Sequence, residues 1–372
     1  MPKLLSAVDS IGPAFAWTKR QLFSPFRFAR WARLAVLCLL TGEFAGGGGS
    51  SGGFHYQMPQ SRRVSLGLNP DTFDWSSFRA YLPWIIAGVA LLLGLILLWI
   101  YVASVYRFVL FDSVLHDRCE LKGSWRRWEP HGRSYFYWCL ALFFGVWVGL
   151  AVIAGGPAFF AWRAGWFQHA REHLPQLILC GIVLLLVLLG FVLASILAGV
   201  FAKDFCVPIM ALENLSVTNA WRRFLPMLGR EKLAYTGFIL MKIVLVVGTA
   251  ILFGILTLIA LVIVAIPLVV AGVVIFFVAK AAGLGWNPAT ISIVVLAAGA
   301  IALGILYLVA FVSTPPMVFF QAYVLHFFSG RYPPLDAIMY PPPVEPPVPS
   351  ASEVPPVFGA PPAPPGEPAL GA

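Results

Sequence analysis

The sequence predicts an all-α membrane protein: a bundle of about six transmembrane helices with an interfacial helix at each end. Of its 372 residues, 60% are hydrophobic and only 11% are charged, whereas soluble globular proteins are about 45–50% apolar and about 25% charged. Apolar runs of about 20 residues recur along the chain, and each can cross a hydrocarbon core of about 30 Å. The net charge is +9, and the basic residues gather at the N-terminus and in two internal loops; without a basic soluble domain we expect no nucleic-acid partner.

Three regions differ in composition. Residues 1–33 interleave aromatic and basic side chains, such as Trp17, Lys19 and Arg20, which favours an amphipathic segment lying on the cytoplasmic leaflet. Residues 34–332 hold the apolar runs and form the predicted transmembrane domain. Residues 333–372 are rich in proline pairs, which is typical of an extended, solvated tail. Such a tail is either recognised by a protein partner or only solvated.

The predicted spans differ in strength. The first, about 34–48, is weak because it is short and contains Glu43. Residues 235–279 are too long for one span, and Pro267 divides them either into two spans or into one span and a re-entrant segment, about 268–283. The second option gives the six spans we prefer, and the first gives seven. The remaining spans are expected at about 82–104, 135–155, 175–201 and 289–313, and an interfacial helix at Phe319–Phe328 follows them.

Basic residues alternate between the predicted loops. Lysine and arginine are frequent before residue 34 and in the loops after the second and fourth spans, and sparse in the loops between them. By the positive-inside rule the basic loops lie in the cytoplasm. Both termini are then inside if there are six spans, and the weak first segment has to cross as well.

Two loops share a short motif in which an aromatic residue precedes two arginines and a second aromatic residue follows them. Each motif comes after a span that enters the cytoplasm, and about ten residues before the next span. The ring suits the membrane interface, and the two guanidinium groups can pair with lipid phosphate. We therefore predict a parallel repeat of span, loop and span that contacts anionic headgroups. The predicted interface residues are Trp125, Arg126, Arg127, Trp221, Arg222 and Arg223.

Charged residues inside predicted spans are costly and are functional candidates by default. Glu43 and Lys242 are the two such residues. Both fall near span ends, so we interpret them as interface residues, with a buried Lys–Glu pair or a proton path as the alternative. Lys203, Asp204 and Glu213 surround the end of the fourth span, where they form either a satisfied helix end, which we favour, or a polar gate.

Catalytic and metal-binding signals are weak. His169, Glu172 and His173 match an H-x-x-E-H zinc pattern, but they fall in a short loop without a soluble domain, so we interpret the match as chance. The five cysteines are widely spaced and suit apolar packing rather than disulfides or metal. We therefore expect no enzyme activity, no cofactor and no bound metal.

The segments Asp204–Glu213 and Ala220–Arg223 resemble uncharacterised bacterial polytopic membrane proteins. These proteins are similar to the membrane domain that precedes some bacterial glycerophosphodiester phosphodiesterases. The resemblance covers most of residues 10–332, and it implies a six-helix domain in the cytoplasmic membrane with both termini inside. It brings no catalytic residues, because the phosphodiesterase domain is absent from this chain.

Two classes of function fit these observations. The first is a scaffold, accessory or lipid-organising protein of the cytoplasmic membrane, in contact with anionic headgroups and, through the proline-rich tail, with a protein partner. The alternative is a small-molecule or lipid transporter or channel, suggested by the repeat and by the break at Pro267. Polar residues are scarce at the middle of the spans, which weakens the alternative. The sequence identifies neither a substrate nor a partner.

Overall fold

The structure, a computed structural model, describes residues 5–24, 27–43, 75–116, 121–166, 174–283, 285 and 287–341. All regular secondary structure in these ranges is helical, which confirms the all-α class. The elements are α1 (Ile11–Phe23), α2 (Phe28–Thr41), α3 (Trp75–His116), α4 (Leu121–Arg163), α5 (Leu174–Phe201), the π-helical turn η2 (Ala202–Cys206), α6 (Val207–Glu213), α7 (Val217–Arg230), α8 (Lys232–Ala281), α9 (Pro288–Val312), α10 (Thr314–Ser329) and α11 (Pro333–Met339).

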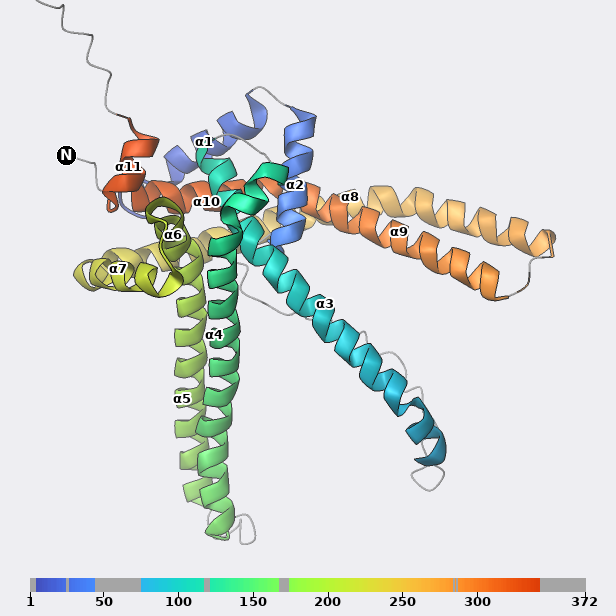
Figure 1. The fold of residues 1–372 in the computed structure, drawn as a ribbon, viewed down its shortest axis with the longest axis horizontal. Helices are drawn as coiled ribbons and strands as arrows, with labels where there is room; N and C mark the ends of the chain where they lie inside the picture. Colours follow the sequence, from blue (N-terminus) through green and yellow to red (C-terminus); the bar gives the residue numbers. More distant parts are fainter. Residues whose placement is uncertain are drawn as a thin grey trace, which may run out of the picture.

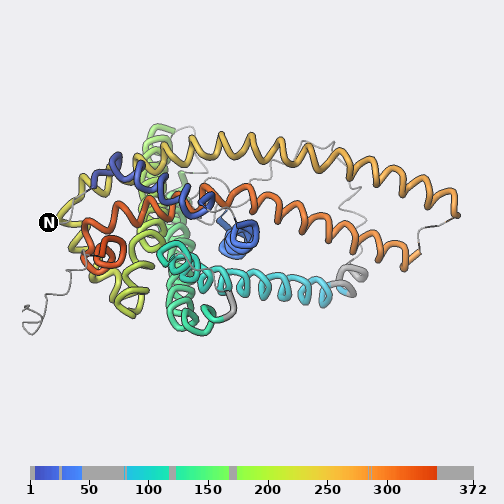
Figure 2. Tube along the Cα trace, turned by 90° about the horizontal axis from the view of Figure 1, so that it is seen from above, coloured from blue at the N-terminus to red at the C-terminus, as the bar shows by residue number. Residues whose placement is uncertain are grey.

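The helices form a compact centre from which three arms project (Figures 1 and 2). We call the centre the hub: it contains α1, α2, α6, α7, α10, α11, η2 and the adjoining ends of the long helices. The arms are the outer part of α3, the α4–α5 hairpin and the α8–α9 hairpin. The long helices all meet at the hub, so residues far apart in the sequence come together there.

Helix α10 lies at the middle of the hub. Thirteen of its sixteen residues are buried, on every face, and a helix that is apolar all round is expected to be buried. Its aromatic rings stack on rings of neighbouring helices; for example, the ring centroid of Tyr323 lies 5.1 Å from that of Phe238 in α8. The predicted interfacial helix Phe319–Phe328 is therefore wrong in its location: it is the core of the hub.

Five helices in the described ranges are long and apolar enough to cross a membrane, which supports the membrane class. They cover Leu82–His116, Gly123–Arg163, Leu174–Glu213, Lys232–Ala281 and Pro288–Val312. Their apolar side chains are largely exposed outside the hub. Pro267 lies inside one continuous α8, so the predicted break there is wrong: α8 is divided neither into two spans nor into a span and a re-entrant segment.

The predicted first span is replaced by α2. This helix has 14 residues, about 21 Å at 1.5 Å per residue, which is too short for a hydrocarbon core of about 30 Å. It ends where Gly42 adopts a left-handed conformation and its N–H bonds Cys38 and Leu39 carbonyls. Helix α2 packs on α9 and α3, so five rather than six described helices have the length of a span.

The two ends of the chain also differ in detail from the prediction. The N-terminal segment forms two helices rather than one, and α1 buries Ala14, Thr18 and Leu22 against the hub while Phe15 stays exposed. At the other end, Pro333–Met339 forms α11, whose Leu335 is fully buried. The extended chain expected from Pro333 onward does not begin there, and residues 342–372 lie outside the described ranges.

Candidate functional site

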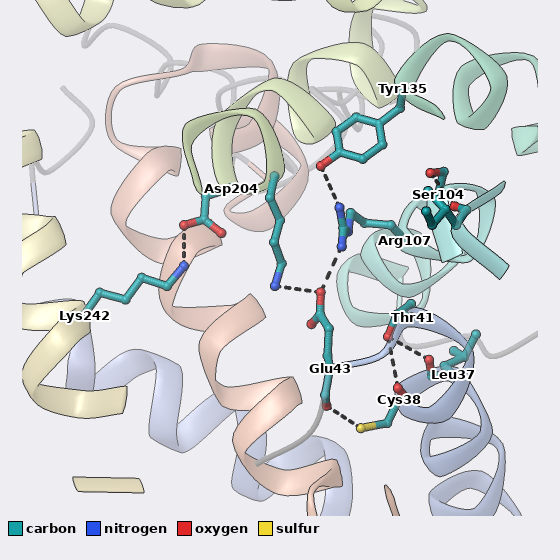
Figure 3. Close-up of polar contacts among 11 residues, drawn as sticks. Leu37, Cys38, Thr41, Glu43, Ser104, Arg107, Tyr135, Asp204 and Lys242 are labelled. Carbon is teal, nitrogen blue, oxygen red and sulfur yellow. Dashed lines mark hydrogen bonds and ion pairs between the residues drawn. The ribbon is translucent and has the colours of Figure 1, made fainter. Parts of the chain in front are cut away.

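A cluster of charged side chains, some buried and some half-buried, lies where the arms meet the hub (Figure 3). It draws residues from five separate elements: the end of α2, α3, α4, the π-turn η2 and α8. We call it the charge cluster, and it consists of Glu43, Arg107, Tyr135, Lys203, Asp204 and Lys242. Each long helix that contributes to the cluster does so near its hub end, so the cluster joins all three arms.

Glu43 is the centre of the larger half of the cluster. The Lys203 ammonium lies 2.7 Å from its Oε1, and the Arg107 Nε lies 3.8 Å from the same oxygen. Arg107 in turn donates from Nη1 to the Tyr135 hydroxyl at 2.6 Å. The Cys38 thiol donates to the Glu43 backbone carbonyl at 2.6 Å, which fixes the chain just after α2. Glu43 is thereby held between two cations from different arms.

The smaller half is the ion pair between Asp204 and Lys242. Asp204 lies in η2 and Lys242 on the hub-facing side of α8. π-Helical turns are frequent at functional sites. Here the turn directs the side chains of two adjacent residues to different partners. Lys203 pairs with Glu43, whereas Asp204 pairs with Lys242, so one turn of chain at the base of α5 connects to both α2 and α8 (Figure 3).

Burial makes these charges interdependent. Burial alone would raise the pKa of Glu43, but the charges of Lys203 and Arg107 outweigh it and hold that pKa below its ordinary value. Glu43 is therefore ionised at neutral pH. Removing one member of a buried pair leaves an unpaired charge, which costs about 3–5 kcal/mol, so the cluster fixes the relative positions of the helices that it joins.

The structure changes the interpretation of two predicted sites. Glu43 is only 5% exposed and Lys242 only 7% exposed, so neither is the interface residue we expected. Both belong to buried ion pairs, but with Lys203 and Asp204 rather than with each other. Arg107 and Tyr135 were missed, because a cation directly after an apolar run is what a membrane-flanking loop also shows.

The two aromatic–arginine motifs have the same pattern of exposure. In each, the first ring is partly buried, the two arginines are exposed and the last ring is buried. The first motif opens α4 and the second lies in α7. The four exposed cations are Arg126, Arg127, Arg222 and Arg223, and Arg223 also approaches Glu213 at 3.5 Å.

The last ring of each motif occupies an equivalent aromatic nest. Trp128 stacks on Phe108 at 6.0 Å, and Tyr135 meets Phe108 edge-on. Phe224 stacks on Phe205 at 5.1 Å, and Tyr235 meets Phe205 edge-on. The residues before the two central phenylalanines are Arg107 and Asp204, both in the charge cluster. The structure therefore supports the parallel repeat beyond the short sequence match.

The described residues contain no group of three or more His, Cys, Asp or Glu side chains that could hold a metal. His169, Glu172 and His173 lie outside the described ranges, as does Cys119, and the chance interpretation of that motif stays a prediction. The other four cysteines are free. The interaction that the described site shows is ion pairing between buried or half-buried side chains.

Fold and site together define an all-helical membrane protein with a charge-paired hub and membrane-length arms. The chain belongs to a family of unknown function, DUF7544, which matches residues 5–338. That match covers both aromatic–arginine motifs and all six residues of the charge cluster. Neither a curated protein nor a solved structure matches the chain.

Proposed function

We propose that this protein is a non-enzymatic scaffold or lipid-organising protein that crosses the bacterial cytoplasmic membrane several times. Its hub lies on the cytoplasmic surface, where the two aromatic–arginine motifs contact anionic headgroups. The observation that carries this proposal is the repeated exposure pattern, in which seated rings present Arg126, Arg127, Arg222 and Arg223 outward. Basic residues near an anionic leaflet contribute about 1 kcal/mol each.

The arms point in different directions (Figures 1 and 2), and one flat bilayer requires them to be closer to parallel. The bases of the arms are the places where such a change would occur. The α4–α5 arm meets the hub at η2, and π-bulges are among the usual places where a helix kinks. We propose that the charge cluster keeps its pairs while the arms change their angle around it.

The experiment compares paired substitutions in the purified full-length chain. R126Q/R127Q and R222Q/R223Q each remove two motif cations, and R79Q/R163Q removes two exposed arginines at the far tips of the arms as a matched control. We expect each motif variant to weaken phosphatidylglycerol binding by about 2 kcal/mol, or roughly thirtyfold, in titrations followed by native mass spectrometry. An equal loss in the control would contradict a special role for the motifs.

The transporter or channel alternative is favoured by one observation, the charged residues buried at the junction of the arms. A proton or ion path through this junction would need Glu43 or Asp204 to exchange partners. Flux of protons and small ions into liposomes that contain the protein tests this alternative. Flux that E43Q abolishes, in a variant that stays folded, would replace the scaffold proposal.

A partner of the proline-rich tail is the remaining part of the proposal. Proline-rich segments bind aromatic grooves of recognition modules at low entropic cost. Affinity purification from native membranes, with and without residues 342–372, tests it. A stoichiometric protein that is lost on deletion supports the scaffold function, and identical co-purification from both forms contradicts a role for the tail.

A further inference from the structure

An apolar groove of about 540 Å³ runs along the first three turns of α8. Its floor is the helix surface around Gly237, and its wall is the chain before α1, residues 6–8. Arg331, at the end of α10, closes one end. The groove thus combines an apolar channel with a single charged end, and none of its residues belongs to the charge cluster or to the aromatic–arginine motifs.

The groove faces away from the hub. Leu233, Gly237, Leu240 and Val244 recur at intervals of four, three and four residues, which places them on one face of the helix. Tyr235, Phe238 and Lys242, which bury against the hub, lie on the opposite face. In a chain whose α8 crosses a membrane, the groove face is the one that meets lipid.

Gly237 creates the hollow. A Cβ built at this position meets nothing within 4 Å, so a larger side chain would extend into the groove without a clash. The groove residues from Leu233 to Val244 cover about 16 Å of helix at 1.5 Å per residue. This length runs from the start of α8 into its apolar part, the direction that an acyl chain takes below its headgroup.

The charged end is built for an anion. The Arg331 side chain is only 8% exposed, and it is fixed by Glu231 at 2.8 Å and by the carbonyls of Leu5 and Phe327 at 3.0 and 2.9 Å. Those bonds use Nε and Nη1, and among the described residues no acceptor bonds Nη2. Arg230 and Lys232, both exposed, flank Glu231 in the sequence, so further positive charge lies close to the Glu231–Arg331 pair.

We propose that this groove binds one anionic phospholipid, with its phosphate at Arg331 Nη2 and an acyl chain along Gly237. Guanidinium and phosphate match in charge and in hydrogen-bond geometry. A water-borne anion would leave the apolar channel unfilled, whereas a phospholipid supplies both parts. The lipid joins α8 to α10 and the N-terminal segment, so it belongs to the fold rather than to the bulk bilayer.

The test titrates the purified full-length chain in detergent with phosphatidylglycerol or phosphatidylcholine of the same acyl chains and counts bound lipid by native mass spectrometry. Gly237→Leu fills the groove, and Gly254→Leu is the matched control, since it changes the same helix at another glycine whose Cβ meets open space. Arg331→Gln removes the charge, and Arg331→Lys, which keeps the charge but not the planar guanidinium, should retain the preference for phosphatidylglycerol.

We expect one phosphatidylglycerol per chain to bind more tightly than phosphatidylcholine. That binding should weaken about tenfold or more in the Gly237→Leu variant and stay unchanged in the Gly254→Leu variant. Arg331→Gln should abolish the preference for phosphatidylglycerol. Equal affinity of the wild type for both lipids, or unchanged binding by Gly237→Leu, overturns the proposal. R222Q/R223Q should keep this one lipid, which separates the groove from the headgroup contacts proposed above.

Discussion

The hub and the arms contain similar apolar and aromatic residues, but these side chains are buried in the hub and exposed in the arms. Phe205 in the hub is fully buried and meets the rings of Phe224, Tyr235 and Phe328 within 5.3 Å. Phe276 in the α8 arm is 57% exposed. In the hub the chain itself supplies the apolar surroundings, whereas in the arms a lipid phase has to supply them. The hub is therefore where sequence specifies contacts, and the arms are where it specifies mainly apolarity.

Charge follows the same division. The described charged residues of the arms gather at the tips, as Arg79, Arg163 and Lys280 do. The buried ones lie in the charge cluster at the base. The lengths of helix between them are apolar, as expected of segments that cross a bilayer. The charges therefore mark the two ends of each arm, and only those at the hub are paired in the interior.

The largest effect is expected from breaking the Asp204–Lys242 pair. Lys242→Met leaves the Asp204 carboxylate buried without its partner, which should cost about 3–5 kcal/mol. Asp204→Leu likewise leaves the Lys242 ammonium buried without its partner. The double variant removes both charges and should recover most of the loss, because a buried pair is often replaceable by apolar side chains. Unfolding in detergent, followed by near-ultraviolet circular dichroism, measures the cycle.

An arm variant sharpens this test. Leu258→Ala changes a 62% exposed side chain in the outer part of α8, and it should change hub stability by less than about 0.5 kcal/mol. Additive losses in the Asp204–Lys242 cycle, or a large effect of Leu258→Ala, would contradict the division between a specified hub and lipid-dependent arms.

Acid should unfold the hub while the arms keep their helices. His326 in α10 is 3% exposed and bonds Tyr340; burial, with a smaller contribution from Arg20, lowers its pKa from 6.5 to about 4. Since the unfolded chain binds a proton at higher pH than the hub does, stability falls as pH drops from about 6.5 to about 4, by on the order of 3 kcal/mol. The pKa of Glu43 is lowered too, so protonation of this carboxylate causes a further loss of stability at pH values below its ordinary pKa.

The measurement pairs near-ultraviolet with far-ultraviolet circular dichroism along a pH titration in lipid nanodiscs. The near-ultraviolet signal of the hub should disappear first, and the helical signal should largely persist. His326→Phe keeps a ring in place and has no titratable group, so its stability should change much less than that of the wild type between pH 4.5 and 6.5. The same slope in this variant would assign the acid effect to other groups.

Much of the arms could be predicted from the sequence, because apolarity over about 20 residues is itself the determinant of a span. The final span expected at 289–313 matches α9, Pro288–Val312. The hub could not be predicted in the same way. Helix α10 is apolar on every face and so has no amphipathic period, and nothing local distinguishes a helix buried in protein from one at a lipid interface.

The charge cluster shows the same limit for the site. Glu43 and Lys242 were singled out because they interrupt apolar runs, but their partners depend on which helix ends meet, at sequence separations of up to 160 residues for Glu43 and Lys203. The aromatic–arginine motifs were found because a repeat is visible in the sequence itself. Their shared pattern of exposure follows from helical spacing. The two rings of each motif are three residues apart and lie on one face of the helix, and the two arginines between them point away from that face.

The smallest effect on stability is expected from alanine substitutions at two glycines of α4, one in the hub and one in the arm. A Cβ at Gly132 would lie 2.7 Å from the backbone Cα of Val105 in α3, so the two helices must separate. A Cβ at Gly149 would lie 2.3 Å from Cζ of Phe191 in α5, the far end of a side chain that can turn into lipid. Gly132→Ala should therefore cost about 1–3 kcal/mol by overpacking, and Gly149→Ala less than about 1 kcal/mol.

Thermal unfolding of both variants in the same detergent checks this order. Gly145, on the same helix, has open space around its Cβ position, so Gly145→Ala controls for the change in helix propensity, which favours alanine by about 1 kcal/mol. A larger loss for Gly149→Ala than for Gly132→Ala would mean that the α4–α5 arm is packed as tightly as the hub. In that case the α4–α5 pair would depend on close side-chain packing as the hub does, and tight and loose packing would distinguish individual helix pairs rather than the hub from the arms.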